Sequence, residues 1–110
     1  MNKIMNLIGL AQKAGKVSNG TESARNSLIK GKAFLLVISN DIAVNTRKDL
    51  LISAEKSKIP WIESGNKYEL GNCVGKEYRV AVTINDHGIA QRILKEFELT
   101  GAEANSMGVV

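Results

Sequence analysis

The sequence predicts an α/β protein, a three-layer α/β/α sandwich with a mixed four-stranded sheet. Helical and strand-like patterns alternate four times along its 110 residues, and such alternation places a sheet between helical layers. The unbroken apolar run at 33–38 is typical of a central strand that is covered on both faces. A chain of this length forms one domain, at 1–101, and the small and polar residues of 102–110 predict a flexible tail.

The N-terminal third predicts two helices with a short strand between them. Apolar residues recur at helical spacing over 4–14, and Gly15 follows at a common position for a helix end. A short strand at 17–18 comes next. Asn19 is then expected to cap the second helix, with Glu22 three places on as its partner in a capping box.

The middle of the chain continues this alternation after the apolar run at 33–38. Thr46 and Asp49 form a second capping pair, which predicts the start of a third helix. Pro60 opens the next short strand, at 61–63, where its missing N–H group is tolerated.

The last predicted elements are two helices with a strand between them. Asn66 with Glu69 repeats the capping pattern, and Gly75 ends the short helix that follows. A strand is expected at 79–84. Asp86 can cap the final helix, which keeps its apolar spacing almost to the end of the predicted domain.

The composition is that of an ordinary soluble protein with a modest excess of positive charge. The formal net charge is +4 and the isoelectric point is near 9.3. Basic charge is a usual feature of nucleic-acid binding, but many basic proteins of this size bind no nucleic acid, so charge alone leaves both interpretations open. No apolar run approaches the roughly 18 residues that span a bilayer, and no signal-like segment is present, which predicts a cytoplasmic protein without a membrane partner.

Groups that could carry catalysis are few. His87 is the only histidine and Cys73 the only cysteine, which excludes metal sites built from two histidines or from a cysteine set. Asp41 and Asp86 follow predicted strands, where they could border a small-molecule site or serve as turn and capping residues. No glycine-rich phosphate loop is present, so the sequence predicts no catalytic residue, no metal site and no cofactor.

A set of short motifs stands in a fixed order along the chain. It consists of Gly20-Thr21 before a helix, Gly31, the strand from Phe34 to Ile38, Asp41, Ile59-Pro60, and Leu70-Gly71 with Gly75. In this set, and most closely in LIGLAQKAGKVSNG, NDIAVNT and LGNCVGKEYRV, the chain resembles the bacterial members of the ribosomal protein L7Ae/L30e family. The resemblance extends over residues 4–97. It implies an α/β/α sandwich that presents two neighbouring loops to kink-turn RNA.

The first implied loop is the turn that leads into the second helix. The family's pattern there is a glycine, one residue, Asn-Glu, and a lysine three places later, whereas this chain has Gly20, Thr21, Glu22, Ser23 and Asn26. Glycine lets an RNA backbone approach, and the N–H groups of a helix start favour phosphate. Glu22 could also accept hydrogen bonds from the guanine of a sheared G·A pair. The alternative is that these residues only cap the helix.

The second implied loop runs from Val74 to Arg79, where the family packs against a flipped-out base and the RNA backbone. Lys76 and Arg79 would add positive charge to this loop, and Tyr78 could stack on a base. In the alternative arrangement, Tyr78 packs against the sheet edge and both cations are merely solvated.

Lys30 and Lys32 could extend the basic surface, or they could be an ordinary solvated helix end. With them, the resemblance implies a cytoplasmic, ribosome-associated RNA-binding protein without catalysis. The expected partner is ribosomal RNA or another structured RNA, possibly within the ribosome, and the protein is expected to be a monomer. A protein-interaction module on the same fold is the competing interpretation, and an enzyme comes third.

Overall fold

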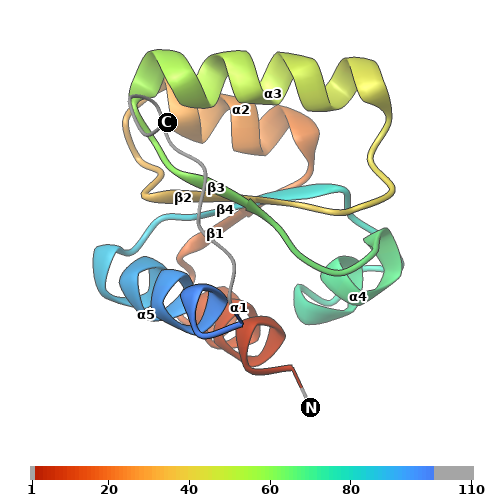
Figure 1. The fold of residues 1–110 in the computed structure, drawn as a ribbon, viewed down its shortest axis with the longest axis vertical. Helices are drawn as coiled ribbons and strands as arrows, with labels where there is room; N and C mark the ends of the chain where they lie inside the picture. The colour runs from red at the N-terminus through yellow and green to blue at the C-terminus, as the bar shows by residue number, and fades with distance from the viewer. Residues whose placement is uncertain (1, 101–110) are drawn as a thin grey trace.

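A four-stranded sheet lies between two helical layers in the computed structural model, which describes residues 2–100 (Figure 1). The elements, in chain order, are α1 (Lys3–Lys13), β1 (Val17–Asn19), α2 (Thr21–Ile29), β2 (Leu35–Ile38), α3 (Val44–Ser57), β3 (Trp61–Glu63), α4 (Lys67–Cys73), β4 (Ala81–Ile84) and α5 (His87–Glu98). Helices α2 and α3 cover one face of the sheet, and α1, α4 and α5 cover the other. The predicted fold class is therefore confirmed. Residue 101 and the predicted tail at 102–110 lie outside the described residues.

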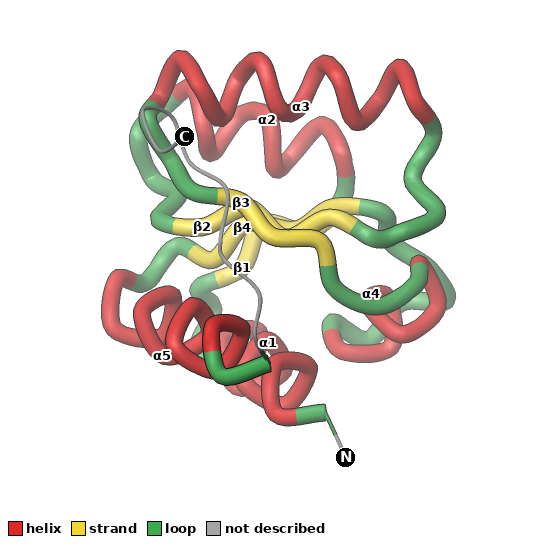
Figure 2. Tube along the Cα trace, viewed as in Figure 1, coloured by secondary structure: helices red, strands yellow, loops and turns green. Residues whose placement is uncertain are grey.

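The sheet is mixed, with the strand order β1-β4-β2-β3 (Figure 2). Strand β4 pairs antiparallel with β1 on one side and with β2 on the other, whereas β2 and β3 are parallel. The parallel pair requires a crossover, which α3 supplies. Strand β4, the last strand in the chain, thus lies in the middle of the sheet, between β1 and β2.

The apolar run of β2 supplies both halves of the core. Leu35 and Val37 pack among α1, α4 and α5, whereas Leu36 and Ile38 pack under α2 and α3. All four side chains are fully buried, which explains why the sequence shows no alternation there. The strand is shorter than the predicted 33–38, because Phe34 is 39% exposed and precedes the paired segment.

Two of the four predicted helix caps are present. The side chain of Asn66 accepts from the backbone N–H of Tyr68 and Glu69, and the Glu69 carboxylate accepts from the Asn66 N–H, which completes a capping box. At the start of α5, the Asp86 carboxylate accepts from the Ile89 N–H at 2.9 Å.

The other two predicted caps are wrong. Helix α2 begins after Gly20, because Asn19 is still paired in β1 and its side chain serves a different partner. Helix α3 begins at Val44, two residues before the predicted cap Thr46, and its N-cap residue Ala43 has no side chain that could cap it. The predicted strand at 79–84 is likewise shorter, since pairing starts at Ala81.

Removing the capping box of α4 should lower stability. Asn66→Ala is expected to reduce the free energy of unfolding by about 1 kcal/mol, because two N–H groups at the start of α4 lose their acceptor. Urea titration followed by circular dichroism measures this change.

Thr46→Ala is the matched control for that measurement. Thr46 lies inside the first turn of α3 and caps nothing, so its replacement by a better helix former should leave stability unchanged or slightly higher. A loss near 1 kcal/mol in this variant would restore the capping role predicted from the sequence.

Candidate functional site

Strand β4 brings the two implied loops to one end of the sheet. The Gly20 N–H donates to the Ala81 carbonyl at 2.9 Å, which holds the turn before α2 beside the first residue of β4. On the other side of the same strand, the Ser39 N–H donates to the Val80 carbonyl at 2.9 Å. The loop that leads into β4 therefore lies next to the Gly20 turn, although about 60 residues of chain separate the two segments.

Gly20 has a backbone conformation that only glycine adopts readily. Its φ is 97° and its ψ is 156°, so any side chain there would be strained. This conformation lets α2 start directly after β1, with the Gly20 carbonyl accepting the first helical hydrogen bond from the Ala24 N–H at 2.9 Å. The N–H groups of the first turn consequently face the neighbouring loop, at the positive end of the helix dipole.

Arg79 joins the two loops. Its Nε donates to the Asn19 side-chain oxygen at 2.8 Å, and its Nη1 donates to the Tyr78 carbonyl at 2.8 Å. Both bonds hold the guanidinium beside Gly20, whose Cα would place an added Cβ 3.7 Å from Arg79 Nε. They occupy only part of the planar donor set of the guanidinium. The role of Asn19 was not predicted, because nothing in the sequence pairs it with a residue so distant.

Gly71 fixes the backbone of the second loop. An added Cβ at Gly71 would lie 2.5 Å from the Cα of Tyr78, a separation that real side chains do not adopt. The Gly71 carbonyl also accepts from the Lys76 N–H at 2.9 Å. Helix α4 thus approaches the backbone of Tyr78 more closely than any residue with a side chain would allow.

Two exposed tyrosines flank a lysine beside this loop. Tyr78 is 53% exposed and Tyr68 is 57% exposed, so about half of each side chain is accessible to a ligand. Lys67 Nζ lies 5.3 Å from the ring centroid of Tyr68 and 5.8 Å from that of Tyr78. Sequence reasoning missed Lys67 and Tyr68. An exposed aromatic residue beside a lysine at a helix start is the signal that could have found them.

These residues surround a shallow hollow of about 350 Å³ between the Gly20 turn and the second loop. It is lined by Asn19, Gly20, Thr21, Glu22, Ser23, Tyr78, Arg79 and Val80. The residues around it include the first turn of α2, one guanidinium, three hydroxyl groups and a single carboxylate, that of Glu22. Such a surface can hold an anionic group and hydrogen-bond to a planar polar one.

Of the remaining predicted site residues, two lie at the loops or one helical turn away, and two lie at the other end of the sheet. Asn26 is exposed on α2, one turn beyond Ser23, and Lys76 is exposed in the second loop. Lys30 and Lys32 follow the far end of α2. The Phe34 N–H, just beyond them, donates to the Ile84 carbonyl, so this segment lies at the opposite end of β4 from Ala81 (Figure 1). The structure therefore separates these two lysines from the loop site.

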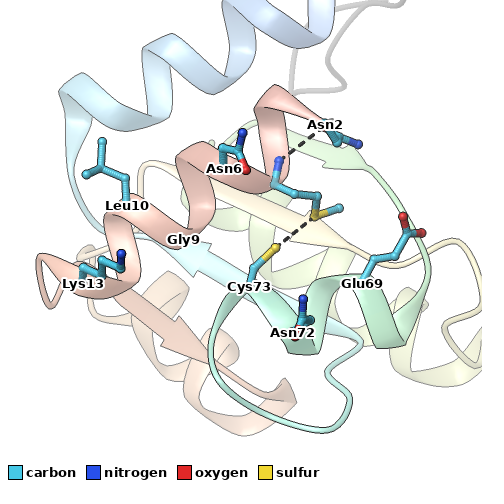
Figure 3. Close-up of a pocket in the computed structure, with 9 residues that line it drawn as sticks. Asn2, Asn6, Gly9, Leu10, Lys13, Glu69, Asn72 and Cys73 are labelled. Carbon is cyan, nitrogen blue, oxygen red and sulfur yellow. Dashed lines mark hydrogen bonds between the residues drawn. The ribbon is translucent and has the colours of Figure 1, made fainter.

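A second hollow, of about 560 Å³, lies between α1 and α4 (Figure 3). Cys73 faces it from α4, and its thiol donates to Met5 Sδ at 3.3 Å. Burial raises the pKa of the Cys73 thiol, and the Glu69 carboxylate adds to this shift. The thiol is accordingly protonated at neutral pH, which makes it a weak nucleophile and a weak metal ligand.

The other groups that could have indicated catalysis have structural partners. The Asp41 carboxylate accepts from the Lys67 N–H at 3.0 Å and so ties the end of β2 to the start of α4. The His87 ring packs edge-on against Phe34, with centroids 5.5 Å apart. Within residues 2–100, no three His, Cys, Asp or Glu side chains are grouped to hold a metal ion. Over the same residues, no helix has the length and apolar character needed to cross a membrane.

Comparisons with known proteins agree with one another. The profile of the Ribosomal protein L7Ae/L30e/S12e/Gadd45 family matches residues 2–94. RNA-binding protein YlxQ of Bacillus subtilis is 31% identical over 88 residues, which are 80% of this chain and 88% of that protein. The large ribosomal subunit protein eL30 of Eremothecium gossypii is 38% identical over 84 residues, covering 74% of this chain and 79% of that one. A solved structure of a Bacillus halodurans protein of unknown function superposes with a TM-score of 0.85 at 28% identity, over 89% of this chain and 99% of that chain.

The close approach at Gly71 generates a prediction about the second loop. Gly71→Ala should lower the free energy of unfolding by about 1–3 kcal/mol, because the added methyl group overlaps the Tyr78 backbone and must displace it. Chemical denaturation gives the stability change, and amide NMR shifts of 74–80 report the displacement of the loop.

Gly9→Ala provides the matched control. Gly9 is also inside a helix that packs on this face, but its added Cβ would lie 3.7 Å from the Cys73 carbonyl, which is ordinary contact. Stability should rise by about 0.5–1 kcal/mol through helix propensity. If both variants behaved alike, the loop would not depend on the approach at Gly71.

Proposed function

The chain belongs to the ribosomal protein L7Ae/L30e/S12e/Gadd45 family, and on that premise we propose that it binds structured RNA through the Gly20 turn and the loop at 74–80. The observation that carries this proposal is the pair of hydrogen bonds that join Arg79 to the two loops. They form one continuous surface from two segments that the resemblance to this family implies in RNA binding.

Phosphate groups of the RNA would bind where the first turn of α2 meets Arg79. The first turn of α2 and Arg79 line the same hollow, and helix N–H groups and a guanidinium both favour an anion with several acceptor oxygens. Gly20 lets the sugar-phosphate chain come close to the protein backbone because it carries no side chain.

Unpaired bases would be held by the aromatic side of the surface. Tyr68 and Tyr78 each leave more than half of their surface accessible, and RNA-binding proteins use such rings to stack on splayed-out bases. Lys67 between the two rings adds a cation that can approach the phosphate of the same nucleotide. A base and its own phosphate can thus be held together.

Recognition of a kink-turn would depend on the residues at the start of α2. Glu22 and Ser23 line the hollow and Asn26 is exposed one turn further on, at the positions where the family carries an Asn-Glu pair and a lysine. The Glu22 carboxylate can accept from guanine N–H groups, although its charge repels nearby phosphates. We therefore expect this chain to bind kink-turn RNA more weakly than a chain with the full pattern.

The proposal describes a binding protein and involves no reaction and no cofactor. It places the protein in the cytoplasm as a monomer, on ribosomal RNA or on another structured RNA, since the relatives include proteins of the large ribosomal subunit.

Direct titration tests the proposed function. A kink-turn RNA should bind more tightly than a plain duplex of equal length or a single strand, and its affinity should fall as salt rises because each phosphate contact releases about one counterion. Arg79→Ala should weaken kink-turn binding by tenfold or more and reduce the salt slope by about one.

Arg92→Ala is the control for loss of one positive charge, since Arg92 is exposed on α5 beside Asn6 of α1 and does not line the hollow between the two loops. It should leave the kink-turn affinity within about twofold. If the wild-type protein binds none of the three RNAs at low salt, the interaction-module interpretation replaces this proposal.

Restoring the family's pattern should strengthen kink-turn binding. The triple variant Glu22→Asn, Ser23→Glu, Asn26→Lys is expected to gain tenfold or more on a kink-turn RNA and much less on a duplex, because it adds base-reading groups along with charge. Within residues 2–100, the Glu22 carboxylate makes no hydrogen bond or ion pair, so its replacement should not lower stability.

Asn45→Lys controls for the added charge in that experiment. Asn45 is exposed on α3, and the substitution changes the net charge by one, as the triple variant does. Equal gains in the triple variant and in this control, or equal gains on kink-turn and duplex, would show that the Gly20 turn contributes charge and no recognition.

A further inference from the structure

Four helices of this chain end with the same backbone motif, and one of them is unusual. A left-handed residue follows the last turn in each case, and the next N–H closes the motif with a hydrogen bond of 2.9 Å to a carbonyl five residues earlier. The left-handed residue is Gly15 after α1, Gly31 after α2 and Gly75 after α4. After α3 it is Lys58, with φ 59° and ψ 39°.

Among the described residues, the exposed Lys58 side chain makes no buried contact that would explain a lysine at this left-handed position. A residue with a Cβ is less stable than glycine in the left-handed region, and the Lys58 side chain is exposed. Strained backbone that local packing does not require is often a sign of function. The structure thus retains a positive charge at a position where glycine would make a more stable helix end.

Three further lysines follow or end the two helices that meet at this end of the sheet. The Ser57 hydroxyl donates to the Leu28 carbonyl at 2.7 Å and so joins the ends of α2 and α3, which finish on the same side of the molecule (Figure 1). The exposed lysines around this junction, here called the terminal lysine patch, are Lys30, Lys32, Lys56 and Lys58.

The terminal lysine patch has little negative charge to balance it. Glu55 is the one acidic residue in the two segments 30–32 and 55–58 that form the patch. The ion pairs that α2 and α3 make lie elsewhere, between Arg25 and Asp49 and between Arg47 and Glu63.

We propose that the terminal lysine patch binds the phosphate backbone of a second RNA segment. This inference rests on the proposed function. Exposed ammonium groups on flexible stems suit a phosphate chain that is held without reading of its sequence. Lysine is depleted at protein–protein interfaces, which favours RNA over an acidic protein as the occupant. Since the patch lies at the opposite end of the sheet from the loop site, the two would contact different segments of a bound RNA.

Two RNAs that differ only in stem length test this inference. The short probe is a kink-turn with stems of about 5 base pairs, and the long probe extends one stem to about 20 base pairs, which makes that A-form stem longer than any dimension of the 31 × 27 × 25 Å protein. The variant Lys30→Gln, Lys32→Gln, Lys56→Gln, Lys58→Gln should bind the short probe within twofold of wild type. On the long probe it should lose tenfold or more in affinity at low salt, and its salt slope should fall by about 2 to 4.

A variant with the same change in net charge separates the patch from diffuse electrostatics. Lys3, Lys48, Arg92 and Lys95 are exposed on other parts of the surface, and their replacement by Gln should leave the long-probe affinity within about threefold. Equal losses in the two quadruple variants, or an unchanged salt slope in the patch variant, would overturn the inference.

Lys58→Gly distinguishes a binding role from a structural one. It should raise the thermal unfolding temperature, because glycine relieves the left-handed backbone, while it weakens long-probe binding. A lower unfolding temperature with unchanged binding would assign Lys58 to the helix end alone.

The two proposals fail in distinguishable ways. If Arg79→Ala has no effect while the patch variant loses long-probe binding, the loop site is wrong and the patch stands. If the wild-type protein binds neither probe, both are wrong.

Discussion

The rest of the structure depends on the pairing of β4 between β1 and β2. This strand is buried on both faces and bonded on both sides, so its position admits little adjustment. At the start of this strand, the Val80 carbonyl accepts a hydrogen bond from the Ser39 N–H, and the Ala81 carbonyl accepts one from the Gly20 N–H. The turn before α2 and the loop before β4 are placed by the same rigid element, which is why two segments distant in the chain can present one surface.

Two glycines convert this scaffold into a site. Gly20 allows a helix to begin without an intervening loop, and Gly71 allows α4 to press against the backbone of the second loop. In each case the absence of a side chain brings backbone groups closer than other residues permit, and a rigid arrangement of donors needs no reordering when a ligand binds. The backbone that carries the remaining side chains of the candidate site is thereby held in place, and the Arg79 guanidinium is held by its two hydrogen bonds.

The sequence was sufficient to predict the layers, the sheet and most of the elements, because burial imposes periodicity and glycine marks helix ends. The sequence-based predictions were wrong where a residue's position or role depends on a partner that is distant in the chain. The residues next to Asn19 predicted that it caps a helix, yet its side chain accepts a hydrogen bond from Arg79, which is 60 residues away. Lys30 and Lys32 were expected to extend the basic surface or to be an ordinary solvated helix end. They follow the end of α2, which places them at the opposite end of the sheet from the loop site. Tertiary contacts of this kind leave no local pattern.

The distribution of charge follows from the same geometry. Helices α2 and α3 both run from the loop end of the sheet to the opposite end, so their N-termini face the candidate RNA site and their C-termini gather at the terminal lysine patch. The helix dipoles favour anions at the first end and lysines at the second. The same two parallel helices therefore place their N-termini beside the candidate site and lysine side chains at the opposite end of the sheet, so both ends carry charge that would suit the proposed RNA.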